Sequence, residues 1–185
     1  MSINLANFYD EILKNEICFF TGVPDSLLKE ICGYISEKTN PQNHIISANE
    51  GSAIAIAAGY HLATGKIPLI YMQNSGLGNA INPLTSLTHQ DVYKIPMLIL
   101  VGWRGEPNEI DEPQHLKQGA ITPDLLHCLD IPTLIVGPDE PKDLPNLKNA
   151  IKLIKQKKSP VALLIKKNSF KKNKSLVSAI DESKL

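Results

Sequence analysis

The sequence predicts a doubly wound α/β domain with a mainly parallel, six-stranded sheet and helices on both faces. Short apolar runs alternate with segments of helical periodicity along almost the whole chain. The apolar runs lack the alternation of apolar and polar residues found in strands with one face in water, so they fit strands covered on both faces. With 185 residues, 43% of them hydrophobic, the chain is long enough to bury such a core as one domain.

The first half of the sequence predicts an opening helix and then strands and helices in alternation. The opening helix, over 4–13, has apolar residues at helical spacing. The predicted strands are 17–20, 44–46 and 67–72. The helices that follow them are, in the same order, one opened by Asp25, one over 50–63 and one over 78–88. The helix over 50–63 is apolar on almost every side, as expected for a helix that packs closely against other parts of a protein.

The second half predicts the remaining strands and contains two segments that interrupt the pattern. The strands are 95–101, 133–136 and 161–165, with a helix over 144–154 between the last two. The polar stretch 102–119 is expected to be a long loop, and loops of that length in compact domains are usually functional or mobile. We predict an α/β domain over 1–168 and a lysine-rich linker over 169–185.

Composition and charge exclude several classes of protein. Nineteen Lys and Arg balance nineteen Asp and Glu, which argues against nucleic acid or an anionic membrane as the main partner. The three cysteines are far apart and form no C-x-x-C pair, and no His, Cys or Asp cluster has metal-ligand spacing, so no metal site is expected in this chain. There is no visible signal peptide and no apolar run of the ~20 residues that a membrane span needs, so we expect a cytoplasmic protein.

Chemically suggestive residues follow the first three strands. Gly22 and Asp25 follow the first, Glu50 follows the second, and the turn 74–80 follows the third. Because the carboxyl ends of parallel strands meet at one edge of a sheet, these residues are expected to converge there.

Glu50 and Asp25 each have two interpretations. A carboxylate at the start of so apolar a helix would be partly desolvated and suited to proton exchange. Alternatively, Ser47-x-x-Glu50 is a capping box, with Glu50 reaching back to the start of its helix. Asp25 is either the N-cap of the next helix or an acid of an active site.

The turn 74–80, Asn-Ser-Gly-Leu-Gly-Asn-Ala, can present backbone N–H groups to a phosphate or a carboxylate. It fails as a dinucleotide-binding fingerprint because Ile81 stands where the third glycine should be. The alternative is a tight strand–helix turn held by Asn79. In the stretch 102–119, Arg104, His115 and Lys117 are candidates for contact with an anionic substrate.

Taken together, these motifs resemble the pyrimidine-binding (Pyr) domain of thiamine diphosphate-dependent decarboxylases. The resemblance is carried by TGVPDSLLKE, by HIISANEGSAIAIAAGYHLATGKIPLIYMQNSGLGNAINPLTSL and by IPMLILVGWRGEPNEIDEPQH, and it covers about residues 6–165. Within that family, the phosphonopyruvate decarboxylases and the α subunits of sulfopyruvate decarboxylases are the most similar groups. The resemblance implies decarboxylation of a 2-oxoacid that carries a phosphonate or a sulfonate, with phosphonopyruvate as the first expectation.

The resemblance also implies roles for individual residues. Glu50 matches the family's glutamate that hydrogen-bonds the aminopyrimidine ring of thiamine diphosphate, and Asp25 is implied as a proton relay. His115 is implied as a third catalytic residue, although this chain has Gln114-His115 where some relatives have two histidines. The remaining implied contacts are Gly22, Gly76 and Asn79 with the cofactor, and Asn74, Ser75, Arg104 and Lys117 with the substrate.

One part of the family pattern is missing from this sequence. The family binds the cofactor's diphosphate through Mg²⁺, with a Gly-Asp-Gly motif on a second α/β domain, and this chain has no Gly-Asp-Gly. We therefore expect the Mg²⁺ ligands outside the chain, on a separate β subunit or on a removed part of a longer chain, with dimers or other homo-oligomers as a further expectation. The alternatives are a non-catalytic α/β module that binds a nucleotide or an anion, and a Pyr domain kept only for dimerisation.

Overall fold

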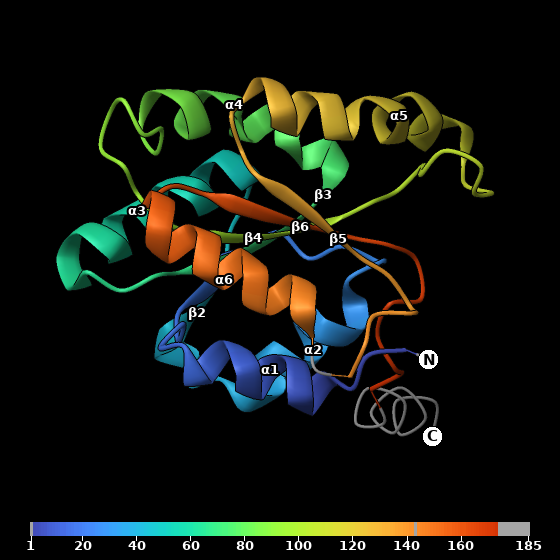
Figure 1. Cartoon of the computed structure of the whole chain (residues 1–185), viewed down its shortest axis with the longest axis horizontal. Helices are drawn as coiled ribbons and strands as arrows, with labels where there is room; N and C mark the ends of the chain where they lie inside the picture. The colour runs from blue at the N-terminus through green and yellow to red at the C-terminus, as the bar shows by residue number, and fades with distance from the viewer. Residues whose placement is uncertain (1, 143, 174–185) are drawn as a thin grey trace.

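The computed structural model, which describes residues 2–142 and 144–173, contains one six-stranded sheet between two layers of helices (Figure 1). All neighbouring strands in it are parallel. The strands are β1 (Phe20–Gly22), β2 (His44–Ile46), β3 (Leu69–Gln73), β4 (Leu98–Gly102), β5 (Thr133–Val136) and β6 (Val161–Ile165). The predicted doubly wound α/β fold is confirmed.

Three helices cover each face of the sheet in the described part of the chain (Figure 1). On one face lie α1 (Leu5–Lys14), α2 (Lys29–Lys38) and α6 (Pro145–Lys157), and on the other lie α3 (Glu50–Thr64), α4 (Leu77–Ser86) and α5 (Pro113–Cys128). Single 3₁₀ turns, η1 (Pro41–Asn43) and η2 (Asn74–Gly76), precede β2 and α4. None of the described helices is long and apolar enough to cross a membrane.

Successive residues of one strand belong to two separate cores. Leu69 and Tyr71 of β3 pack with α1, α2 and α6, whereas Ile70 and Met72 pack with α3 and α4. Both sets must be apolar because each faces helices rather than water. This explains why the strands show no alternation in the sequence.

The sheet has the order β2-β1-β3-β4-β6-β5, which reverses direction at β1. The chain passes from β1 to β2 through α2, then returns through α3 to β3 on the other side of β1. The turn after β1 leads to α2 on one face and the turn after β3 leads to α4 on the other, so these two turns diverge and leave a crevice at the strand ends. Open α/β sheets bind their ligands in such a crevice.

The segment after β6 packs on the amino-terminal part of the chain. Phe170 forms a parallel bridge with Ile3 and packs edge-on against Phe8, with their ring centroids 5.1 Å apart. The Asn173 N–H donates a hydrogen bond of 2.6 Å to the Glu30 carboxylate on α2. The first five residues of the expected linker over 169–185 are therefore packed on the domain, and 174–185 lie outside the described residues.

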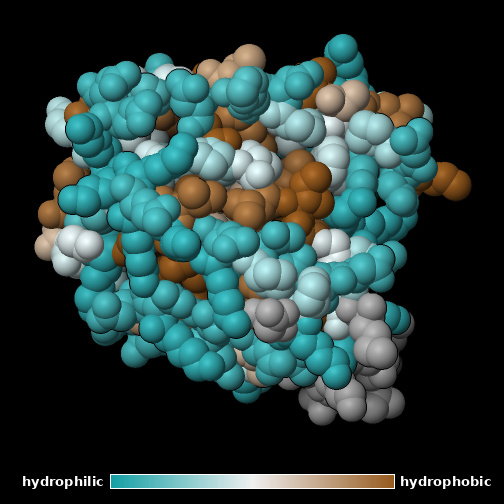
Figure 2. Space-filling model, viewed as in Figure 1, coloured by the Kyte–Doolittle hydropathy of each residue, from teal (hydrophilic) through white to brown (hydrophobic). Residues whose placement is uncertain are grey.

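The largest difference from the sequence prediction is the stretch 102–119. Only its first part is a loop, because α5 begins at Pro113 and continues to Cys128, where no helix was expected. The predicted helix at Asp25 also begins later, at Lys29. In the space-filling view, apolar side chains form a band across the middle of the molecule, over the edge strand β5 (Figure 2).

Candidate active site at the strand ends

Glu50 is the first residue of α3, at the carboxyl edge of the sheet. Its helix is capped by Asn49, whose side chain accepts a hydrogen bond of 2.9 Å from the Ser52 N–H. Ser47 instead bonds the Thr21 hydroxyl at 2.9 Å, in a buried position. The capping-box interpretation is therefore wrong, and the Glu50 carboxylate is not used to begin its own helix.

The Glu50 carboxylate lies across the glycine turn that follows β3. Asn79 Nδ2 on α4 donates a hydrogen bond of 2.8 Å to Glu50 Oε2. A Cβ on Gly76 would collide with the carboxylate, so the absence of a side chain at Gly76 creates the space for it. A carboxylate held against this turn would repel a phosphate bound there, which argues against a nucleotide-binding turn.

Asp25 lies in the turn between β1 and α2 and is only 7% exposed. Its Oδ2 accepts hydrogen bonds from the N–H groups of Leu27 and Leu28 at 3.1 and 3.3 Å, and it packs where a Cβ on Gly102 would be. Oδ1 is buried and has no hydrogen-bond partner among the described residues. Burial raises the pKa of Asp25 above its usual value, although these N–H groups and the nearby Arg104 lower it in part.

Gly22 ends β1 and allows a side chain from β3 to pass across that strand. A Cβ there would collide with the backbone carbonyl and ring of Tyr71. The Tyr71 hydroxyl consequently reaches His44 on β2, with 2.7 Å between its oxygen and His44 Nε2. The structure gives Gly22 this packing role, and its contact with a cofactor stays a prediction.

Asn74 fastens the loop after β4 to the turn after β3. It is fully buried, and its Nδ2 donates to the Arg104 carbonyl at 2.8 Å and to the Thr122 hydroxyl at 2.9 Å. Its Oδ1 accepts from the Arg104 N–H at 3.2 Å. With its amide bonded in this way, Asn74 holds the loop in place, and its contact with a substrate stays a prediction.

Arg104 is held by a residue that the sequence did not single out. Asp111, at the far end of the loop, accepts hydrogen bonds from Nε and Nη2 of Arg104 and from the Gly105 and Glu112 N–H groups. Arg104 and these N–H groups lower the pKa of Asp111 far below its usual value. Arg104 Nη1 donates to Ser26 Oγ at 3.0 Å, so the loop is also tied to the turn that carries Asp25.

The other predicted residues are not drawn into this cluster. His115 and Lys117 lie in the first turns of α5, and neither side chain has a hydrogen bond or ion pair with the other candidates in the described part of the chain. Ser75 is exposed, and its hydroxyl accepts a hydrogen bond of 2.7 Å from Gln73. The structure thus brings together Glu50, Gly76 and Asn79 at one point, and Asp25 and Arg104 at a second.

The sequence of this domain matches a known protein family. Residues 4–125 match the family described as thiamine pyrophosphate enzyme, N-terminal TPP binding domain. The chain belongs to this family. The stretch that matches the thiamine pyrophosphate-binding domain contains Glu50, Asp25 and the whole loop after β4.

Two groups of relatives resemble this thiamine pyrophosphate-binding domain in sequence. Over 124 residues it is 41% identical to phosphonopyruvate decarboxylase of Streptomyces viridochromogenes, a match that covers 66% of the chain and 30% of that protein. Over 158 residues it is 37% identical to sulfopyruvate decarboxylase subunit alpha of Methanococcus maripaludis, covering 85% of the chain and 90% of that subunit. The chain therefore spans less than a third of the first relative and nearly all of the second.

Solved structures of low sequence identity share the fold. A 4-hydroxybenzoylformate decarboxylase from Rhodococcus jostii, a thiamine diphosphate-dependent enzyme, aligns with a TM-score of 0.67 at 18% identity, over 91% of this chain and 31% of that one. Benzoylformate decarboxylase from Polynucleobacter necessarius aligns with a TM-score of 0.64 at 20% identity, over 94% and 31%. The thiamine pyrophosphate-binding domain thus corresponds to under a third of each of these chains.

Proposed function

We propose that this chain is the pyrimidine-binding half of a thiamine diphosphate-dependent decarboxylase. The substrate is a 2-oxoacid, phosphonopyruvate first and sulfopyruvate as the alternative. The observation that carries the proposal is the Glu50 carboxylate, which is fixed by Asn79 over Gly76 at the edge where α/β sheets bind ligands. The family match and the names of the relatives support the reaction class and the two substrates.

The residues at this edge fit the pyrimidine end of thiamine diphosphate. One oxygen of Glu50 is bonded to Asn79, which leaves acceptor capacity on the carboxylate for a ring nitrogen of the cofactor. The space over Gly76 exists only because that residue lacks a Cβ. When bound, the cofactor supplies the electron sink that carbon dioxide loss from a 2-oxoacid needs. Glu50 would hold a proton on the pyrimidine ring, and Asn79 would orient Glu50.

Asp25 is suited to hold a proton that is later delivered to the product. Its burial favours the neutral acid, and its Oδ1 is a buried atom without a partner in the described chain. A carboxyl group with a raised pKa keeps its proton to a higher pH than an ordinary aspartate does, which suits a proton donor. We assign this step to Asp25, next to the loop that Arg104 holds.

The proposal requires a second polypeptide or domain. The chain lacks the Gly-Asp-Gly motif with which the family binds the diphosphate through Mg²⁺, so the proposal assigns the Mg²⁺ and diphosphate ligands to that second part. The name of the sulfopyruvate decarboxylase relatives, subunit alpha, fits an assembly from separate subunits. We infer that this chain assembles with a diphosphate-binding half and that each complex contains two or more copies of this chain.

Reconstitution tests the proposal directly. The chain is combined with a diphosphate-binding half, thiamine diphosphate and Mg²⁺, and release of carbon dioxide from phosphonopyruvate and from sulfopyruvate is measured. We expect turnover of at least one acid, none by the chain alone, and a loss of roughly 100-fold or more in Glu50→Gln. Undiminished turnover in Glu50→Gln would contradict the role of Glu50, and absence of turnover with either acid would contradict the proposed reaction.

A further inference from the structure

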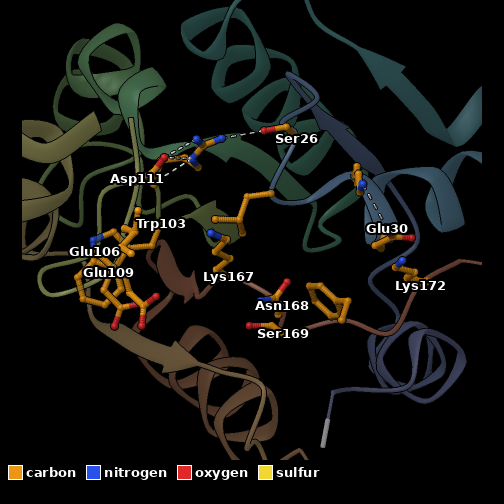
Figure 3. Close-up of a pocket in the computed structure, with 15 residues that line it drawn as sticks. Ser26, Glu30, Trp103, Glu106, Glu109, Asp111, Lys167, Asn168, Ser169 and Lys172 are labelled. Atoms are coloured by element: carbon orange, nitrogen blue, oxygen red, sulfur yellow. Dashed lines mark hydrogen bonds and ion pairs between the residues drawn. The ribbon is translucent and has the colours of Figure 1, made fainter. Parts of the chain in front are cut away.

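A cavity of about 310 Å³ lies beside Arg104, outside the ends of β4 and β6 (Figure 3). It is walled by the start of α2, by the loop after β4 and by the segment after β6. Its lining residues include four cationic side chains and four carboxylates: Lys29, Arg104, Lys167 and Lys172, and Glu30, Glu106, Glu109 and Asp111.

Most of the carboxylates in the cavity wall already have a donor. Three of them are engaged within the described chain: Asp111 by Arg104, Glu106 by Lys166 with 2.6 Å between Oε1 and Nζ, and Glu30 by the Asn173 N–H at 2.6 Å. The fourth, Glu109, is exposed and is one of the groups that raise the pKa of Lys166. Apart from the ion pair of Glu30 with Lys29, with 3.9 Å between Oε1 and Nζ, these carboxylates are directed to groups other than the lysines of the cavity.

Lys167 and Lys172 are left without a counter-charge. Neither has a hydrogen bond or ion pair within the part of the chain that the structure describes. Lys167 extends from the segment after β6 toward the side of the cavity where Asp111 lies, whereas Lys172 lies at the far end, beside Glu30 (Figure 3). The cavity is thus lined by two exposed ammonium groups, those of Lys167 and Lys172, that have no counter-charge within the described chain.

The apolar part of the wall increases the effect of these charges. Trp103 and Phe170 both line the cavity and are each 8% exposed. Charges in a concave site with apolar walls interact more strongly than on open surface, because less water screens them. The segment that carries Lys167 is anchored, since the neighbouring Ser169 hydroxyl donates to the Val136 carbonyl at 3.0 Å.

We propose that this cavity binds the tetrahedral oxyanion of the substrate, a phosphonate or a sulfonate, and that Lys167 is the residue that determines specificity for it. The proposal rests on the proposed function, in which the substrate is a 2-oxoacid that carries a phosphonate or a sulfonate. Arg104 already donates hydrogen bonds to Asp111 and Ser26, so its role is to shape the cavity. The free ammonium group of Lys167 binds the anion. A phosphonate near its second ionisation carries more charge than a sulfonate, so phosphonates bind more tightly.

Trp103 provides a local signal, since it is the only tryptophan of the sequence and it lines the cavity. The full chain is titrated with phosphonoacetate, sulfoacetate and inorganic phosphate, without cofactor or partner, while tryptophan fluorescence and heat are recorded. We expect saturable binding, with phosphonoacetate tighter than sulfoacetate. In Lys167→Gln the Kd for phosphonoacetate rises about tenfold, the value of one charge-assisted hydrogen bond. Inorganic phosphate shows whether the oxyanion alone is enough for recognition. We expect it to bind the parent chain as well, and to bind Lys167→Gln more weakly.

Lys171→Gln is the matched control, because Lys171 belongs to the same segment and is exposed but does not line the cavity. Its Kd should stay within about twofold of the parent chain. Equal weakening in both variants, or no binding by the parent chain at millimolar probe, would overturn the proposal.

In the reconstituted decarboxylase, Lys167→Gln should raise KM for the anionic acid about tenfold and leave kcat nearly unchanged. An unchanged KM in an active enzyme overturns the cavity proposal while the proposed function stands. The opposite outcome is also distinguishable. If phosphonoacetate binds in a Lys167-dependent way but the reconstituted protein decarboxylates neither acid, the proposed function is overturned and the proposed oxyanion site still stands.

Discussion

The position of the Glu50 carboxylate depends on Gly76, because a Cβ at that position would overlap the end of the Glu50 side chain. Gly76→Ala should leave the fold intact, since the overlapping group is a flexible side chain that can move aside. It should lower decarboxylation by the reconstituted enzyme by on the order of 100-fold, the typical effect of misplacing a catalytic group by ~1 Å. Gly78→Ala is the control, because a Cβ there meets nothing within 4 Å, and it should change the rate less than twofold. Equal rates in the two variants would contradict the geometry.

The raised pKa of Asp25 makes a prediction about stability and pH. Burial favours the protonated acid in the folded state, so Asp25 contributes stability that is fully present below its unfolded pKa, near 3.8, and is lost as the pH rises through the higher folded pKa. Asp25→Asn cannot ionise and keeps an acceptor for the N–H groups of Leu27 and Leu28. The variant should therefore gain free energy of unfolding relative to the parent as the pH increases.

Urea unfolding of both proteins at about pH 4 and about pH 7 measures this gain. A difference in stability that stays constant between the two pH values would contradict a raised pKa for Asp25. Decarboxylation by the reconstituted enzyme provides a second readout. It should be lower in Asp25→Asn, because this variant lacks the proton that we assign to Asp25.

The individual residues of the site were more predictable than their interactions. Glu50 and Asp25 could be found because each directly follows a strand, and parallel strands bring their carboxyl ends together. The Asn74 and Asp111 contacts could not be found, because each joins positions that only the packed loop brings close. The sequence contained one indication of the second contact, because Asp111 is an acidic residue in the same polar stretch as Arg104. Spacing alone, however, does not say which carboxylate binds a given arginine.

At the scale of elements, the loop after β4 and α5 form one unit. Trp103 Nε1 donates to the Gly119 carbonyl at 2.9 Å, and a Cβ on Gly119 would collide with the Gly105 carbonyl. The helix therefore packs against the loop through a glycine. It also contains Pro123, and glycine and proline both disfavour a helix when read from sequence. These residues explain why 102–119 was predicted as a loop throughout and why the helix over 113–128 was missed.

Asn74 supports this unit, so Asn74→Ala should destabilise it more than an exposed substitution nearby. The change removes the three hydrogen bonds that the Asn74 amide forms with the Arg104 backbone and the Thr122 hydroxyl, and we expect a loss of about 2–4 kcal/mol in the free energy of unfolding. Ser75→Ala, at the exposed neighbouring position, should change it by less than about 0.5 kcal/mol. Urea unfolding gives both values, and faster hydrogen exchange at the start of α5 in Asn74→Ala alone would locate the effect. Similar stability of the two variants would show that Asn74 does not hold the loop.

At the scale of the molecule, the sheet was predictable and the order of its strands was not. Apolar strands without alternation require helices on both faces, and this requirement is local to each strand. The order β2-β1-β3-β4-β6-β5 depends on which neighbours the connecting helices bring together, and no short stretch of sequence records that. The reversal at β1 is nevertheless what gives the turns of Asp25 and Asn74 a common crevice.

The extent of the domain leads to the last prediction. The boundary expected at 168 was based on composition, because the lysine-rich sequence that follows looks solvated. Phe170, however, is 8% exposed, contacts Phe8 edge-on and is bridged to Ile3, so the segment after β6 closes the core beside α1. We propose that the folded domain includes this segment, in which case Phe170→Ala should lower the free energy of unfolding by about 3–5 kcal/mol. Lys171→Ala, next to it and exposed, should have an effect below about 0.5 kcal/mol. If urea unfolding gave the two variants equal stability, the segment would be a linker that merely touches the domain, and the cavity that Lys167 lines would lose its fixed wall.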